Sequence, residues 1–165
     1  MADIDHIINC LECTPVILNT LLESIPQELY KVQRVNNKWS IHEQVCHLVD
    51  AQEILINRFK QFELEESPTI KTYDPPADRS SNHYLNLNME NELQRFPALR
   101  KSMTSMLKGF APSYWDKTGK HVAFTPYSSK ILLIHSLNVD YAHLFSIEQL
   151  GLTKEGLEEE ILTIP

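Results

Sequence analysis

A single short motif places the start of one long helix in this chain. Ser40 is followed three residues later by Glu43, the pattern in which a serine side chain caps a helix and the glutamate reaches back to the cap. Apolar residues then recur every three or four positions as far as Phe62, which is the spacing of one buried helical face. The motif and the spacing together predict a helix over about residues 41–64, whose apolar face other elements must cover.

Three further stretches carry the same helical spacing. They cover about residues 3–24, 88–109 and 129–150, and Gly151 is predicted to end the last one. The stretch 129–150 is apolar almost all round, so we expect this helix to lie at the centre. Only four glycines are present, too few for the many tight turns of a sandwich or barrel. We predict an all-α four-helix bundle with long crossover connections, forming one domain over residues 1–165 with its core at about 8–151.

Two features interrupt this pattern. Thr14 followed by Pro15 fits either the start of a helix or a kink within a longer one. Residues 66–87 are rich in proline, serine and asparagine and form a long connection. Such a loop is either functional, for example a pocket lid, or a plain crossover between parallel helices. A second connection covers residues 110–127, with a short extended piece expected at 120–124.

The charge, the apolar runs and the cysteines indicate which partners and which cell compartment to expect. Acidic residues outnumber basic ones by 22 to 15, for a net charge of −7, so the surface is unsuited to nucleic acid or anionic lipid. No run of about 18 apolar residues occurs, and the first residues carry acids where a signal peptide would carry bases. Cys10, Cys13 and Cys46 are odd in number and give no disulfide framework. We expect a cytoplasmic protein with no membrane or nucleic-acid partner.

Histidines on two of the predicted helices are the candidates for chemistry. His47 lies at the edge of the apolar stripe of its helix, and His135 and His143 lie on the last helix. A histidine on a buried face needs a hydrogen-bond partner or a metal ion for its ring nitrogens. His135 and His143 are eight residues apart, about 12 Å along the axis, so only one of them can share an ion with His47. Spacing alone leaves both roles open, hydrogen-bonded core histidine and metal ligand.

Two stretches resemble the DinB/YfiT-like superfamily. The run from Lys38 to Asp50 is similar to the family's second-helix signature of tryptophan-serine, a short spacer, histidine-leucine and an acid. The run from His135 to Leu150 is similar to the family's last helix, which carries histidine, acid, two residues, histidine and leucine. The similarity of pattern and spacing covers roughly residues 8–151.

The resemblance implies a four-helix bundle, often dimeric, in which three histidines hold a divalent ion, commonly nickel or zinc. It implies that His47 and His143 are two of the ligands, with water at the open positions. Characterised relatives include transferases of low-molecular-weight thiols, a thiol-dependent isomerase and proposed metal-dependent hydrolases, whereas many members have no known activity. A small-molecule substrate, such as a thiol conjugate, and a homodimer are therefore expected.

One position departs from the family's pattern. The first histidine of the last-helix pair falls on Val139, which cannot bind a metal, whereas catalytic sites of this kind normally fix three protein ligands. Asp140, three residues before His143, is our candidate for the third ligand, because a carboxylate and a histidine three apart on a helix can both point inward. The resemblance implies a second possibility, that the acid at this position orients a ligand or has a structural role. Asp50 on the second helix and His121 in the preceding connection are alternatives.

Other reactive side chains have simpler interpretations. Cys10 and Cys13 lack a second cysteine pair and the strand context of a redox motif. Cys46 points about 100° away from His47 on its helix, so we interpret it as a packing residue. Arg58, on one helical line with His47, either holds an anionic group of a substrate or forms a surface salt bridge.

Three hypotheses about function follow. The first is a metal-dependent transferase or hydrolase in which an ion held by His47 and His143 activates a water or a thiol, with Asp140 or Asp50 completing or orienting the set of ligands. The second is a bundle that has kept the fold, lost the metal and binds a small molecule. The third is a homodimeric structural protein. Val139 favours the second hypothesis, and the first two stay open.

Overall fold

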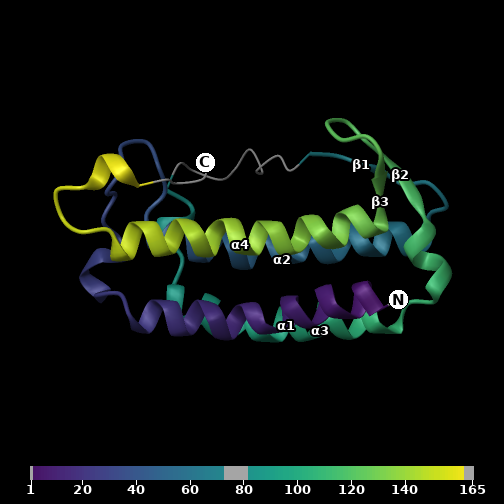
Figure 1. Cartoon of the computed structure of the whole chain (residues 1–165), viewed down its shortest axis with the longest axis horizontal. Helices are drawn as coiled ribbons and strands as arrows, with labels where there is room; N and C mark the ends of the chain where they lie inside the picture. Colours follow the sequence, from purple (N-terminus) through teal and green to yellow (C-terminus); the bar gives the residue numbers. More distant parts are fainter. Residues whose placement is uncertain (1, 73–81, 162–165) are drawn as a thin grey trace.

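The computed structural model describes residues 2–72 and 82–161. Four long helices lie side by side in an elongated bundle (Figure 1): α1 (Ala2–Glu23), α2 (Ile41–Leu64), α3 (Met89–Gly109) and α4 (Ser129–Leu152). α1 and α2 each pack against both α3 and α4, so they occupy opposite corners of the bundle. The predicted all-α four-helix bundle is confirmed, and the predicted helix limits agree with the observed ones to within two residues.

The helices run in two pairs of opposite direction. α1 and α4 run one way, whereas α2 and α3 run the other way (Figure 1). The connection at 65–88 therefore has to return along the bundle from the end of α2 to the start of α3, which is a long crossover of the kind that the sequence predicts. The connection at 110–128 joins the neighbouring ends of α3 and α4.

Short elements shape the connections. β1 (Thr69–Ile70) pairs in parallel with β2 (Thr118–His121), which pairs antiparallel with β3 (Tyr127–Ser128). The remaining turns are η1 (Gln27–Leu29), η2 (Tyr84–Asn86), η3 (Pro112–Asp116) and η4 (Glu158–Glu160). The extended piece expected at 120–124 overlaps β2 only at Lys120 and His121. η2 contacts α2 and belongs to the connection 66–87, whose residues 73–81 lie outside the described part of the chain.

Local chemistry explains how two helices begin and continue. The Ser40 hydroxyl accepts a hydrogen bond from the Glu43 backbone N–H, and the Glu43 carboxylate accepts one from the Ser40 N–H at 2.8 Å, so the predicted capping box is confirmed. Pro15 lies inside an uninterrupted α1, so Thr14 does not start a helix. Because proline has no N–H to donate to the carbonyl four residues earlier, the Leu11 carbonyl oxygen lacks its usual donor, and the Thr14 hydroxyl lies 2.9 Å from it.

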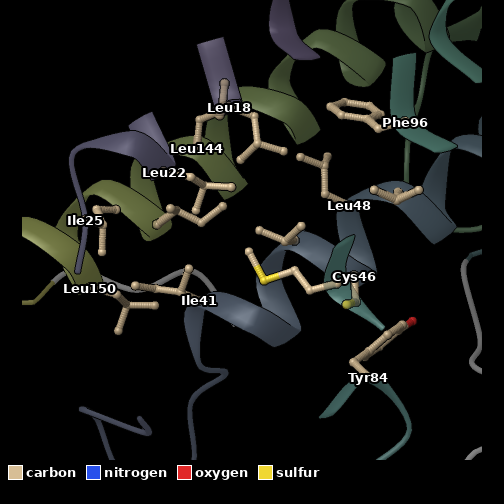
Figure 2. Packing of buried hydrophobic residues seen from close by; sticks show 14 of the residues in the cluster. Leu18, Leu22, Ile25, Ile41, Cys46, Leu48, Tyr84, Phe96, Leu144 and Leu150 are labelled. Atoms are coloured by element: carbon tan, nitrogen blue, oxygen red, sulfur yellow. The ribbon is translucent and has the colours of Figure 1, made fainter. Parts of the chain in front are cut away.

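Two apolar clusters fill the bundle, one toward each end. The first is built largely from Leu18, Leu22, Ile25, Ile41, Val45, Leu48, Phe96, Leu144, Ile147 and Leu150 (Figure 2). The second is built largely from Ile8, Leu11, Leu55, Phe59, Phe62, Met103, Leu107, Leu132 and Leu133. Between them, one fully buried polar residue from each of the other three helices contacts Asp140 of α4. We call these four residues the central polar cluster: Thr14, Gln52, Arg100 and Asp140.

α4 differs from its predicted form in two respects. Gly151 does not end the helix, which continues to Leu152; a Cβ at Gly151 would lie only 2.2 Å from Cδ1 of Ile25. Glycine is therefore required for the close approach of the chain after α1 to α4. α4 is also not buried all round, because Ile134, Tyr141 and Phe145 are each about two-fifths exposed, at 42%, 45% and 40%.

Candidate functional site

The histidine pair expected from the sequence is brought together between α2 and α4. The ring centroids of His47 and His143 lie 5.0 Å apart, with the ring planes inclined by 58°. His143 is buried and His47 is half-buried. The two helices run antiparallel, so that the first turns of α2 lie beside the last turns of α4. The remaining candidate, His135, has its ring beside Phe124, at the other end of α4.

A buried glutamine fixes the ring of His143. Nδ1 of His143 lies 2.6 Å from the side-chain oxygen of Gln44, and since this oxygen can only accept, Nδ1 carries the proton and donates it. Burial, with the nearby His47, lowers the pKa of His143 to about 3. The ring is therefore neutral near pH 7, with its lone pair on Nε2, which is the form of histidine that binds metal ions.

A tyrosine and an aspartate fix the ring of His47. The Tyr84 hydroxyl donates to Oδ2 of Asp50 at 3.2 Å and lies 3.0 Å from Nδ1 of His47. Because the phenol gives its proton to the carboxylate, Nδ1 of His47 donates to the phenol oxygen. Metal-binding histidines are commonly oriented by such an acceptor on the second ring nitrogen. Asp50, proposed as a ligand or orienting group, therefore acts on His47 through Tyr84.

Trp39 closes one side of the pair. Its ring centroid lies 4.6 Å from that of His47 and 6.4 Å from that of His143. Trp39 directly precedes the capping serine, so the same motif that starts α2 also positions an aromatic wall beside the histidines. Burial by such a ring reduces the local dielectric and strengthens polar interactions within the site.

The structure places Asp140 away from the histidine pair, in the central polar cluster. Its Oδ2 forms an ion pair with Arg100 and lies 2.7 Å from the Thr14 hydroxyl, and its Oδ1 lies 3.4 Å from the Gln52 side-chain nitrogen. Burial raises the pKa of the Asp140 carboxyl, and the charge of Arg100 opposes this shift. Asp140 thus stabilises the bundle interior and does not join His47 as a third ligand, because its oxygens are taken up by other helices.

No other described side chain completes a metal site. Within residues 2–72 and 82–161, no group of three or more histidine, cysteine, aspartate or glutamate side chains could hold an ion. His121 lies against Phe124 and Tyr127 beside the small sheet. Val139, at the position of the family's third histidine, packs against the first apolar cluster.

Arg58 contacts a backbone carbonyl instead of forming the expected salt bridge, whereas Cys46 is buried as expected for a packing residue. Arg58 donates from Nη2 to the Lys71 carbonyl oxygen at 2.9 Å, so it holds the crossover to α2 and forms no salt bridge with a described residue. All three cysteines are free thiols. Cys46 is buried, and burial raises the pKa of its thiol to about 12, which keeps it protonated and fits a packing role.

Sequence reasoning missed Gln44 and Tyr84 beside the histidines, and Gln52 and Arg100 in the central polar cluster. Gln44 and Tyr84 orient the histidines, but nothing in their spacing marks them, and Tyr84 comes from a connection without periodicity. Arg100 had a usable signal. It lies four residues after Phe96 and three before Met103, both inward-facing, and a charged residue on an apolar line needs a buried partner of opposite charge.

The fold and the paired histidines together define a class: four-helix bundles with a histidine site between two antiparallel helices. Within that class the chain belongs to the DinB superfamily, whose family model matches residues 11–137. The matched span includes His47 and ends before Val139 and His143. The last-helix part of the site is therefore assigned by the geometry and by the resemblance described above.

Two known proteins are similar to this chain. The "Putative metal-dependent hydrolase OB0782" of Oceanobacillus iheyensis is 29% identical over 118 residues, which are 72% of this chain and 68% of the relative. The solved structure of YfiT from Bacillus subtilis, described as "a probable metal-dependent hydrolase with an unusual four-helix bundle topology", matches with a TM-score of 0.73 at 20% identity. This match covers 88% of this chain and 86% of YfiT, and it shows that the two share a fold.

The donor set fits a divalent ion with two protein ligands. Neutral imidazoles suit nickel and zinc, and both rings here are held by an acceptor on Nδ1. A valine at the third position contributes no donor, so water or a substrate would supply the other ligands. Separately, none of the helices in the described residues is long and apolar enough to cross a membrane.

Proposed function

We propose that the protein is a metal-dependent hydrolase or transferase that acts on a small molecule, such as a thiol conjugate, in the cytoplasm. His47 and His143 hold the divalent ion, nickel or zinc, through Nε2. One observation carries the proposal: two imidazole rings from different helices lie 5.0 Å apart, each with Nδ1 anchored on a separate acceptor. The names of the two similar proteins support the metal-dependent hydrolase class.

The residues of the site have distinct tasks in this proposal. A bound divalent ion lowers the pKa of a coordinated water or thiol, which creates a nucleophile near neutral pH. Gln44 holds His143 in the neutral form with the proton on Nδ1. Tyr84, itself held by Asp50, orients the ring of His47 through Nδ1, and Trp39 limits the access of water on one side of both rings.

A second candidate function is favoured by Val139. Two imidazoles without a third protein ligand bind a metal weakly compared with the three-ligand sites of metalloenzymes. The alternative is a non-catalytic member of the family that has lost the metal and binds a small molecule beside Trp39, His47 and His143. In that case the histidines keep their hydrogen bonds to Tyr84 and Gln44 and act as polar groups of a binding site.

Metal content decides between the two candidates. Protein purified without an affinity tag is loaded with nickel or zinc, desalted and analysed for metal per chain. The proposal predicts one ion per chain, lost in His47→Ala and His143→Ala and retained in the control His6→Ala, which changes an exposed histidine of α1. Absence of metal from the wild-type chain under both loadings overturns the metal-dependent function and supports the binding protein.

A second measurement replaces Val139, the residue that departs from the family's histidine pattern. Val139→His restores the family's third histidine, four residues before His143, and is predicted to raise the affinity for nickel or zinc at least tenfold over the wild-type chain. A variant that binds no more metal than wild type contradicts the placement of the site between His47 and His143.

A further inference from the structure

Three basic side chains lie together at the end of α2 and α4 that is remote from the histidine pair. Arg58 follows His47 on α2 by three helical turns, so both project from one face of the helix, roughly 16 Å apart along the axis. His135 precedes His143 on α4 by about 12 Å. β2 carries His121 to the same end of the bundle, where the small sheet lies beside the start of α4 (Figure 1). We call Arg58, His121 and His135 the basic cluster.

Contacts with the small sheet and its loop bring the basic cluster together. Arg58 donates from Nη2 to the carbonyl oxygen of Lys71 at 2.9 Å. Lys71 directly follows β1, which pairs in parallel with β2, the strand that carries His121. The ring of Phe124 contacts both histidines, with ring centroids 4.7 Å from His121 and 6.1 Å from His135. Side chains from α2, β2 and α4 therefore meet at one place.

The basic cluster has no acidic partner in the part of the chain that the structure describes. None of its three side chains forms an ion pair with a described residue. Burial and the charge of Arg58 lower the pKa of His121, and burial, Arg58 and His121 lower the pKa of His135. A bound anion would have the opposite effect, because it favours the charged form of each ring. In a chain with a net charge of −7, such a group of basic side chains without acids calls for an explanation.

The basic cluster also offers hydrogen-bond donors that no described residue uses. The backbone N–H of Ala123 donates to Nδ1 of His121 at 3.0 Å, so the proton of the neutral ring lies on Nε2 and is available for an acceptor. Arg58 makes one hydrogen bond, to Lys71, whereas a guanidinium group carries five N–H donors. Tyr127, packed on His121, is buried, and its hydroxyl has no partner among the described residues. All of these groups suit an oxygen-rich anion.

We propose that the basic cluster binds an oxyanion group, a carboxylate or a phosphate, and that this group is the anionic end of the substrate. Arg58 and Nε2 of His121 donate to its oxygens, and His135 lies beside it. A guanidinium group matches the geometry of both oxyanions. The assignment to the substrate rests on the proposed function, whereas the binding of an anion does not. The spacing along α2 and α4 predicts an anionic group roughly 12–16 Å from the reacting atoms.

Titration of the metal-free full chain with inorganic phosphate and with acetate tests the proposal. Nuclear magnetic resonance of the histidine rings follows each titration at constant ionic strength. We expect saturable binding of at least one anion in the millimolar range, and a rise in the pKa of His121 and His135 but not of His6, which is exposed on α1. Binding of phosphate alone assigns a phosphate group, and binding of acetate alone assigns a carboxylate. Binding of neither anion overturns the proposal.

Variants separate a specific site from general attraction between charges. Arg58→Gln and His121→Gln are each expected to weaken anion binding at least tenfold, and Arg58→Lys should weaken it less, because it keeps the charge but not the paired donors. The matched control Lys60→Gln removes a positive charge from an exposed position on α2, about 200° around the helix from Arg58, and should leave binding unchanged. Equal weakening in Lys60→Gln and Arg58→Gln overturns the proposal.

Two further measurements make the result unambiguous. Circular dichroism melting confirms that each variant is folded. Because the titration uses metal-free protein, its outcome does not depend on the metal-loading experiment. A chain that binds the anion but takes up no nickel or zinc would refute the metal-dependent function and leave the anion site standing, whereas a chain that takes up metal but binds neither anion would refute the anion site alone.

Discussion

Two polar groups lie within the bundle, and they differ in how many helices contact each of them. In the central polar cluster, Asp140 is contacted from three other helices, by Thr14, Gln52 and Arg100. In the histidine pair, the hydrogen bonds to Gln44 and Tyr84 occupy Nδ1 of each ring, and the two ring centroids lie 5.0 Å apart. His143 is only three residues from Asp140. α4 therefore carries a group that holds the bundle together and a histidine that we propose as a metal ligand.

The largest effect is expected from removing the cation of the central polar cluster. Arg100→Met leaves the Asp140 carboxylate buried without its charge partner, and we expect the free energy of unfolding to fall by about 3–5 kcal/mol. Urea unfolding measures the change. Arg95→Met is the matched control, since Arg95 lies near the surface and its ion pairs with Glu53 and Glu92 contribute about 1 kcal/mol or less.

The double variant Arg100→Met, Asp140→Leu separates charge pairing from packing. Replacing both ions by apolar residues of similar size removes the unpaired charge, so it should recover most of the stability lost in the single variant. A single variant as stable as the Arg95→Met control would contradict the structural role assigned to the ion pair.

The histidine pair should respond to pH where metal is absent. Burial and the nearby His47 lower the pKa of His143 to about 3, compared with about 6.5 in the unfolded chain. Between these values the unfolded chain binds one more proton at this residue than the folded chain. The free energy of unfolding therefore falls by about 1.4 kcal/mol per pH unit as the pH drops below about 6.5.

Urea unfolding of metal-free protein at pH 7, 6 and 5 measures this slope. His143→Gln removes the titrating ring and should flatten the profile by about one proton, whereas His6→Gln, on the exposed side of α1, should leave it unchanged. Equal slopes in the wild-type chain and His143→Gln would mean that His143 is charged in the folded state, which conflicts with the burial that lowers its pKa.

A smaller effect is expected from loosening the orientation of His47. Tyr84→Phe removes the hydroxyl between Nδ1 of His47 and Asp50, and loss of such an orienting group typically lowers metal affinity about 10–100-fold. Competition with a chelating dye measures the affinity. Tyr30→Phe is the control, because its hydroxyl donates to the Leu22 carbonyl oxygen, away from the site. Unchanged affinity in Tyr84→Phe would show that Tyr84 does not orient a ligand.

The two polar groups also show which features of the structure could be predicted from the sequence. Helical spacing and the Ser40–Glu43 capping box predicted α2 and the bundle, because these signals are local to one segment. Spacing left both His135 and His143 open as the partner of His47, and the family resemblance implied His143. The partners of these residues did not, because contacts such as Arg100 with Asp140 join different helices and depend on helix rotation and crossover direction, which no single segment encodes.

Asp140 is a case in which sequence spacing did not determine which neighbouring helix the side chain contacts. Its spacing of three from His143 is compatible with a shared ion, yet two helical positions three apart still differ by about 60° around the axis. That angle is enough to direct the carboxylate toward Arg100 of α3 and the imidazole toward Gln44 of α2. To choose between a metal ligand and a partner of Arg100, one has to know which helix lies beside Asp140, and only the packed structure shows this.

The smallest effects are expected within the central polar cluster, where two polar neighbours of Asp140 differ in geometry. The Thr14 hydroxyl lies 2.7 Å from Oδ2, whereas the Gln52 nitrogen lies 3.4 Å from Oδ1. Thr14→Val keeps the side-chain shape and removes a hydrogen bond to a buried charge, so it should cost about 1.5 kcal/mol. Gln52→Leu should cost less than about 1 kcal/mol, because it also removes a buried side-chain oxygen that has no partner among the described residues. Urea unfolding of both variants gives the order, and a larger loss in Gln52→Leu would mean that glutamine, rather than threonine, is the main neutral partner of the Asp140 carboxylate.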